Sequence, residues 1–218
     1  TFLIGLVLYV GFKKENIKIN LRQAFLLTIV SWFLVALFGS LPFIYSSSSL
    51  HFTDAFFESV SGITTTGSTV ISNLDNLSEG ILIWRSLLQW FGGIGIIVLA
   101  IAILPTLQIG GMQLLHMEHD DPYEKTIPKI NKFIIEIASL YVSLTVLCFI
   151  FYYIFGMSAF DSLIHCMTTI STGGFSNHSL SFKYFNSYSL ENISVVFMIL
   201  GSLPFVIFIQ FIHGQKMS

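Results

Sequence analysis

The chain has 218 residues, of which 54% are hydrophobic and only 10% charged, with a net charge of −2. Soluble domains carry roughly 25% charged residues, and a single core could not bury so much apolar surface. The composition therefore excludes an ordinary soluble domain, indicates a protein in contact with membrane lipid and gives no basis for binding nucleic acid. Cys148 and Cys166 lie in apolar or membrane-adjacent segments, which indicates small buried side chains rather than a disulfide framework.

The first half of the chain alternates long apolar segments with one short segment. We expect residues 1–20 to comprise the end of a preceding membrane helix and a basic linker. Residues 21–44 are long enough, at about 1.5 Å per residue, to cross a hydrocarbon core about 30 Å thick. Residues 54–63 would cross only about half of it as a helix, with Asp54 as the expected N-cap. Residues 81–104 form the next predicted span, which Pro105 ends.

The second half repeats this order of elements. A polar loop precedes a span at residues 133–155, a second half-length segment at 161–170 and a last span at 193–212. The fold class we predict is an all-α polytopic membrane protein, built from tandem repeats of span, pore helix, filter loop and span about an axis along the membrane normal. Its expected divisions are the leading segment 1–20, a first repeat at 21–105, a cytoplasmic loop at 106–132 and a second repeat at 133–218.

The basic residues divide unevenly between the predicted loops. Lys and Arg beside membrane spans concentrate on the cytoplasmic side. Only Arg85 and Lys183, of ten such residues, belong to the parts that carry the half-length segments. We therefore expect both half-length segments to enter the membrane from outside, and the following residues to lie on the cytoplasmic side: Lys13, Lys14, Lys18, Arg22, Lys125, Lys129, Lys132 and Lys216.

A loop rich in Thr and Gly follows each half-length segment, and the two loops align when the sequence is shifted by 107 residues. This shift places Thr65 on Thr172 and Gly67 on Gly174. Irregular backbone at membrane depth is tolerated only where it is buried in protein or lines a water-filled cavity, and rings of backbone carbonyls can replace the hydration shell of K⁺. We therefore predict a K⁺-binding filter formed by the backbone of Thr64, Thr65, Thr66, Gly67, Ser171, Thr172, Gly173 and Gly174.

Several other residues are candidates for supporting roles. As helix caps, Asp54 and Asp161 would support the filter. The glycines Gly92, Gly93 and Gly95 lie in mid-span, where close helix packing and a gate below the filter are both open interpretations. Arg85 either extends toward the outer interface or pairs with a partner such as Glu58. The pair His116 and His119 lacks further ligands and indicates a solvated loop rather than a metal site.

An ordered set of motifs makes the chain similar to the membrane subunits of the Trk/Ktr bacterial potassium-uptake family, of the TrkH kind. These motifs are TTTGSTV at 64–70, LLQWFGGIGIIVLAIAILP at 87–105, STGGFS at 171–176 and LGSLPFVIFIQ at 200–210. The resemblance implies K⁺ uptake across the bacterial inner membrane, with H⁺ or Na⁺ coupling as an open question. It also implies a homodimer, a TrkA-like cytoplasmic nucleotide-binding regulatory subunit, no covalent cofactor, and four span–pore–span repeats around one pore.

The sequence carries two such repeats, so an alternative interpretation is a non-transporting membrane scaffold, or a degenerate fragment that needs a second chain to complete the pore. An intramembrane enzyme is a more distant alternative, because the spans contain neither paired carboxylates nor a nucleophile beside a base. Each loop also lacks the second glycine of the TVGYG pattern of potassium channels, which predicts a shorter or less selective filter.

Overall fold

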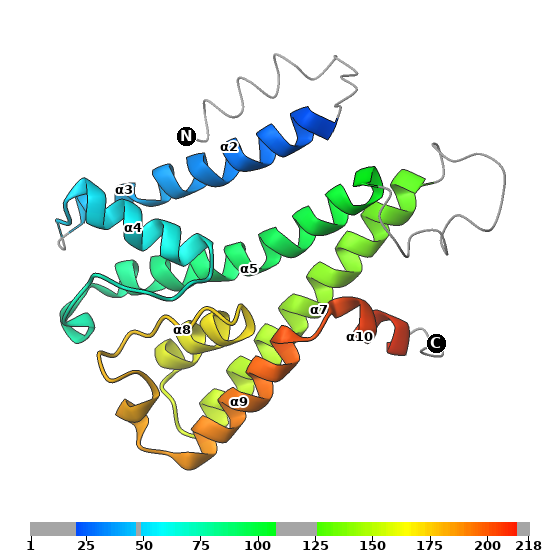
Figure 1. Cartoon of the computed structure of the whole chain (residues 1–218). Helices are drawn as coiled ribbons and strands as arrows, with labels where there is room; N and C mark the ends of the chain where they lie inside the picture. Colours follow the sequence, from blue (N-terminus) through cyan, green and yellow to red (C-terminus); the bar gives the residue numbers. More distant parts are fainter. Residues whose placement is uncertain (1–20, 47–48, 108–125, 213–218) are drawn as a thin grey trace.

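In the computed structural model, the described residues 21–46, 49–107 and 126–212 form helices and connecting loops, with no β-strand among them (Figure 1). The all-α prediction is confirmed. The elements in chain order are α2 (Leu21–Gly39), α3 (Leu41–Tyr45), α4 (Phe52–Ile63), η1 (Leu74–Asn76), α5 (Glu79–Leu107), α7 (Thr126–Ile154), α8 (Ala159–Ile170), η2 (Ser181–Phe185), α9 (Tyr188–Ser202) and α10 (Phe205–Ile212).

Within these described residues, three segments are long and apolar enough to cross a membrane: Phe25–Tyr45, Glu79–Ile97 and Lys132–Ile154. The ends of two spans differ from the prediction. Helix α5 continues past Pro105 to Leu107, and α7 begins at Thr126, so residues 126–132 are helical rather than part of a loop. Pro128 is compatible with this early start because the N–H groups of a first helical turn have no partner within the helix.

Two predicted spans are interrupted, both at the pentapeptide Gly-Ser-Leu-Pro-Phe, which occurs at residues 39–43 and 201–205. Helix α2 ends at Gly39 and α3 resumes at Leu41, with Pro42 in its first turn. Helix α9 ends before Leu203, which is extended (φ −70°, ψ 143°) in front of Pro204. A proline disfavours helical torsions in the residue before it, which accounts for Leu203. Ser40 keeps helical torsions (φ −75°, ψ −22°), and the first break reflects the missing N–H of Pro42. The span predicted over 21–44 is therefore present as Phe25–Tyr45 with a short interruption at Ser40, whereas the span predicted over 193–212 is divided between α9 and α10.

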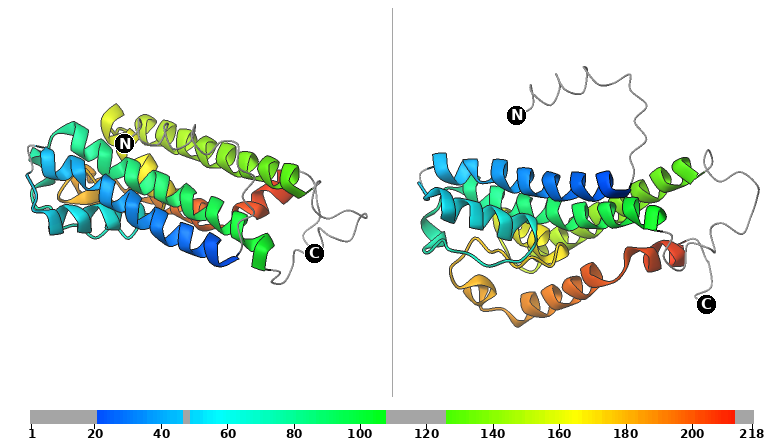
Figure 2. Two further views of the ribbon diagram at one scale, coloured as in Figure 1. Left: turned by 90° about the horizontal axis from the view of Figure 1, so that it is seen from above. Right: turned by 45° about the horizontal axis from the view of Figure 1, so that its top comes forward.

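Helix α5, the second span of the first repeat, lies between α4 and α8 (Figures 1 and 2). On one side, α4 packs against both α2 and α5; on the other, α8 packs against α5, α7 and α9. One buried cluster joins α3 and α4 with η1 and α5, and a second joins α7 and α8 with α9 and α10. The free cysteines Cys148 and Cys166 are buried in the second cluster, as expected.

The outer faces of the spans are apolar and exposed. On α2, for example, Leu26, Ile29 and Phe33 each expose more than half of their surface. In water such a continuous apolar face would be unfavourable, whereas lipid tails solvate it. The described spans therefore have the surface of a membrane protein, with the polar loops after α4 and α8 held between them.

Candidate functional site

The two short helices that precede the Thr/Gly loops have the predicted length, but their N-caps differ from the prediction. The N-caps are His51 for α4 and Ser158 for α8, so Asp54 and Asp161 are each the third helical residue. The hydroxyl of Ser158 accepts from the Asp161 amide at 3.0 Å and donates to its carboxylate at 2.7 Å. A carboxylate in the first turn still faces the positive end of the helix dipole.

The backbones of the two loops adopt the same conformation. Thr65 and Thr172 have φ values of 54° and 53°, and Gly67 and Gly174 both have a φ of 80°. The amide three residues after the end of each helix also donates back to it at 2.9 Å, from Thr66 in the first loop and Gly173 in the second. A left-handed torsion costs a residue with a side chain roughly 1–2 kcal/mol, and both loops hold a threonine in this conformation. The repeat of 107 residues therefore extends to individual backbone torsions.

Most carbonyl oxygens of these loops have no hydrogen-bond donor. Among the residues that the structure describes, none donates to the carbonyls of Thr65, Thr66 or Gly67, nor to those of Thr172 and Gly174. Carbonyl groups are obligatory acceptors, so in the protein they require water or a cation. Each short helix also directs the partial negative charge of its C-terminus toward its loop. This arrangement suits a dehydrated cation.

One side chain of each short helix contacts the far end of its own loop. Both carboxylate oxygens of Glu58 lie within 3.0 Å of the Thr69 hydroxyl, and His165 Nε2 lies 3.0 Å from the Ser176 hydroxyl. In the sequence these pairs are again 107 residues apart. Each hydroxyl also accepts a hydrogen bond of 3.1 Å from the amide two residues later. The repeat thus preserves the contact while its chemistry differs, with a carboxylate in one copy and an imidazole in the other.

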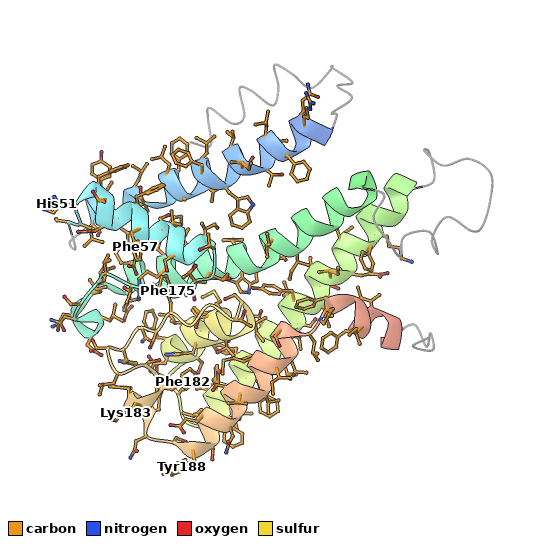
Figure 3. The ribbon with its side chains drawn as sticks, in the orientation of Figure 1. His51, Phe57, Phe175, Phe182, Lys183 and Tyr188 are labelled. Carbon is orange, nitrogen blue, oxygen red and sulfur yellow. The ribbon has the colours of Figure 1, made fainter. Side chains whose placement is uncertain are left out.

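Arg85 on α5 joins the two loops. It is 1% exposed, and its Nε lies 2.8 Å from Glu58 Oε1. Its Nη1 donates to the Ser176 carbonyl at 2.9 Å, and its guanidinium lies 4.1 Å from the ring centre of Phe175, which Figure 3 labels. The pairing with Glu58 is confirmed. The alternative, extension toward the outer interface, is wrong because the surrounding groups neutralise and hydrogen-bond the charge within the protein.

Gln89 lies one helical turn after Arg85 and binds the second loop through both ends of its amide. Its Nε2 donates to the Gly173 carbonyl at 2.9 Å, and its Oε1 accepts from the Phe175 amide at 3.0 Å. The sequence analysis missed this residue. The available signal was an Arg and a Gln four positions apart, and therefore on one face, in an otherwise apolar span.

Two of the three candidate glycines in α5 allow close packing against the pore helices. A Cβ on Gly92 would overlap the carbonyl of Ile63 at the end of α4, and one on Gly93 would lie 2.9 Å from the Cβ of Ser171 after α8. A Cβ on Gly95 would meet nothing closer than 3.7 Å. Gly92 and Gly93 therefore have a packing role, and their proposed gating role stays a prediction.

Outside the loops, His178 connects the two repeats. Its ring nitrogens lie 2.9 Å from Asp75 Oδ1 and 3.1 Å from Asp161 Oδ1, and the ring stacks on Tyr184 at 3.6 Å. Asn177 also donates to Asp161, at 2.6 Å. These residues line an open cavity of about 550 Å³. Hydrogen bonding by Ser179, and then by His178, lowers the pKa of Asp75 to about 2.

The remaining candidates concern metal binding. In the part of the chain that the structure describes, no group of three or more His, Cys, Asp or Glu side chains could hold a metal ion. His116 and His119 lie outside the described residues.

Together these features define a class: a multi-pass α-helical membrane protein in which two short helices are each followed by a loop whose carbonyls are largely without donors. The family model described as "TrkH: Cation transport protein" matches residues 1–218, and the chain belongs to this family. It is a protein of the bacterial inner membrane.

Curated relatives and a solved structure agree with this assignment. The chain is 44% identical to the Trk system potassium uptake protein TrkI of Halomonas elongata, over 93% of this chain and 42% of the relative. It is 42% identical to TrkH of Escherichia coli K12, over 99% of this chain and 45% of the relative. The crystal structure of the potassium transporter TrkH from Vibrio parahaemolyticus matches with a TM-score of 0.75 and 42% identity, covering 88% of this chain and 38% of that one. The chain thus spans less than half the length of these relatives.

Proposed function

We propose that the chain contributes two loops of a selectivity filter through which K⁺ enters the cell. The observation that carries this proposal is the pair of Thr/Gly loops with matching torsions and carbonyls that lack donors. The relatives of the chain are named as potassium uptake proteins, which supports the proposal. The chain would act as part of a channel-like or symporter-like translocating subunit, with no covalent chemistry.

The proposed ligands are backbone oxygens rather than side chains. Carbonyl dipoles would replace the water around K⁺, and the C-terminal ends of α4 and α8 would add a favourable field for a cation. Because each loop holds a single glycine at positive φ, the filter would be shorter than that of a tetrameric channel. The proposed binding residues are Thr64, Thr65, Thr66, Gly67, Ser171, Thr172, Gly173 and Gly174, with Asp54 and Asp161 in support.

The assembly we propose follows the resemblance to the Trk/Ktr family. Two further repeats would complete a ring of four loops, and two such proteins would form a dimer. The repeats would correspond to residues 21–107 and 126–212, with both pore helices entering from outside. The segment between them would face a cytoplasmic nucleotide-binding regulatory subunit of the TrkA kind. Coupling of K⁺ to H⁺ or Na⁺ belongs to the same proposal.

The experiment is K⁺ uptake by the full-length, four-repeat protein in cells that lack their own K⁺ uptake. A matched pair of variants distinguishes an effect on the filter from the general effect of backbone strain at a positive φ. Gly174 and Gly156 both have positive φ, and a Cβ on either would meet nothing within 4 Å, but Gly174 lies in a Thr/Gly loop whereas Gly156 lies in the turn between α7 and α8. We expect Gly174→Ala to reduce K⁺ over Na⁺ selectivity and Gly156→Ala to leave it unchanged. Absence of K⁺-dependent growth with the unmodified protein would overturn the proposal.

A further inference from the structure

We infer that Gln89 is a positioning residue that sets the ion selectivity of the second loop from a helix of the first repeat. The inference rests on the proposed filter and adds a determinant outside it. The Gln89 side chain is fully buried. Its amide is bound at both ends by backbone groups two residues apart, Gly173 O at 2.9 Å and Phe175 N at 3.0 Å.

The contact is specific to an amide. A primary amide supplies one acceptor and two donors on one planar group, which here meet a carbonyl and an N–H of the same loop. A carboxylate could keep only the acceptor, and an apolar side chain neither. Gly173 also contributes, because a Cβ at that position would overlap the amide of Gln89. The two residues therefore fit only as a pair.

The same face of α5 holds the loop at a further point. Arg85, one turn earlier, donates to the Ser176 carbonyl at 2.9 Å and lies over the ring of Phe175. Helix α5 thus binds Gly173, Phe175 and Ser176. Gly174, between the two residues that Gln89 binds, has a carbonyl to which no described residue donates. The torsions that direct this carbonyl are therefore fixed from α5 together with α8, where the Thr168 carbonyl accepts from the Gly173 amide at 2.9 Å.

The first loop also contacts α5, because Arg85 Nη2 donates to the Thr69 hydroxyl at 3.2 Å, but no described residue binds it as Gln89 binds the second loop. In the first loop, the Ser61 hydroxyl of its own pore helix donates to the Ser68 carbonyl at 2.6 Å. Gly92 in α5 and Gly201 in α9 meet equivalent positions at the ends of the two pore helices, which makes Met198 in α9 the counterpart of Gln89. Met198 is 41% exposed. Met198 has no amide group with which to bind a loop, so it provides a matched control position on α9.

The test compares Gln89→Met, Gln89→Glu and the control Met198→Leu in the full-length protein, reconstituted in lipid vesicles. Met has nearly the shape of Gln but cannot make these hydrogen bonds, whereas Glu loses the donor. We expect the K⁺ over Na⁺ flux ratio to fall about tenfold in Gln89→Met, the equivalent of one hydrogen bond, and also to fall in Gln89→Glu. The control should keep the ratio of the unmodified protein.

A second readout separates positioning from structural support. A K⁺ ion bound in the filter raises the Tm of the folded protein by mass action, so the Tm in K⁺ minus the Tm in Na⁺ reports selective binding. A structural role would lower both Tm values equally, whereas a positioning role reduces their difference. If Gln89→Met does not accumulate in the membrane, Gln89→Glu supports the same comparison.

The outcomes are distinct. An unchanged flux ratio and Tm difference in Gln89→Met would overturn the role of Gln89 while leaving the filter intact. If the unmodified protein showed no selectivity for K⁺ over Na⁺, the proposed filter itself would be overturned. A selectivity loss in Met198→Leu equal to that in Gln89→Met would also overturn the inference, because the loss could then not be assigned to the hydrogen bonds of Gln89 on α5.

Discussion

The two Thr/Gly loops share a backbone but differ in how they are held. Residues 64–70 are largely exposed in this chain, and Glu58 and Ser61 of their own short helix secure them together with Arg85 of α5. Residues 171–177 are mostly buried, and Gln89 of α5 secures them in addition to Arg85 and to His165 of their own short helix. The two loops have the same torsions, and the binding of loop backbone by Gln89 is the contact that the second loop has in addition. The loop conformation is therefore the common requirement, and the supports can vary.

Helix α5 is the element on which both loops depend. It supplies the cation that neutralises Glu58 beside the first loop and the amide that binds the second. The following predictions test whether the supports of each loop can be removed without affecting the other loop.

The largest effect is expected for Arg85→Met. Removing one member of a buried ion pair leaves Glu58 buried without its counter-charge, which costs about 3–5 kcal/mol. Thermal unfolding of the purified full-length protein measures it, with Lys183→Met as a control because Lys183 is exposed. A Tm for Arg85→Met as high as that of Lys183→Met would show that the pair does not hold the loops.

The next effect distinguishes the two filter glycines. Gly67 and Gly174 have equal φ values, so alanine strains each by roughly 1–2 kcal/mol. At Gly67 a Cβ would also overlap the Gly173 carbonyl of the other loop, whereas at Gly174 it would meet open space.

Overpacking adds about 1–3 kcal/mol, so Gly67→Ala should lower the Tm further than Gly174→Ala. It should also disturb selectivity more, as measured by K⁺ and Na⁺ fluxes. Equal effects at both positions would contradict the contact between the loops.

A smaller effect is expected in the spans. Gly201→Ala would place a Cβ 2.6 Å from the Ile170 carbonyl at the end of α8, with an expected cost of about 1–3 kcal/mol. Gly95→Ala has room and should raise stability by up to about 1 kcal/mol, because alanine favours helix over glycine. Thermal unfolding of both variants measures the difference. A Gly201→Ala protein as stable as Gly95→Ala would show that the spans do not approach the pore helix as described.

The smallest effect concerns the outer contact of Asp75 with the second repeat. Its pKa in the folded protein is about 2, below the ordinary 3.8. Because the folded value is depressed, the stabilisation is present above about pH 4 and is lost as the pH falls through the folded pKa. The Tm of Asp75→Asn should therefore depend less on pH between about 4 and 2 than that of the unmodified protein. Parallel Tm curves for the two proteins would exclude this role.

Composition and spacing were sufficient to predict the helical class, the long spans and the positions of the two loops, because apolar length and the repeated Thr/Gly pattern are local signals. The helix breaks at Ser40 and Leu203 were missed although a Pro follows within two residues of each, since the apolar pattern continues across them. The N-caps were misplaced by three residues, because His51 is an uncommon cap and Ser158 competes with the nearby Asp161.

The partner of Arg85 was predicted, but its depth was not, since burial depends on how α5 packs between the repeats. Gln89 was missed for the same reason. Its two partners lie 84 and 86 residues away in the chain, and no pattern within α5 indicates which carbonyl a glutamine will meet.

The central claim is that backbone carbonyls of both loops bind K⁺. The most direct measurement is an experimental structure of the full-length protein in Rb⁺ or Tl⁺, with anomalous scattering used to locate the ions. The account predicts ions within coordination distance of the Thr65 and Thr66 carbonyls in the first loop, and of the Thr172 and Gly174 carbonyls in the second. Ions found only in the outer cavity beside Asp75 and Asp161, with none at either loop, would contradict it.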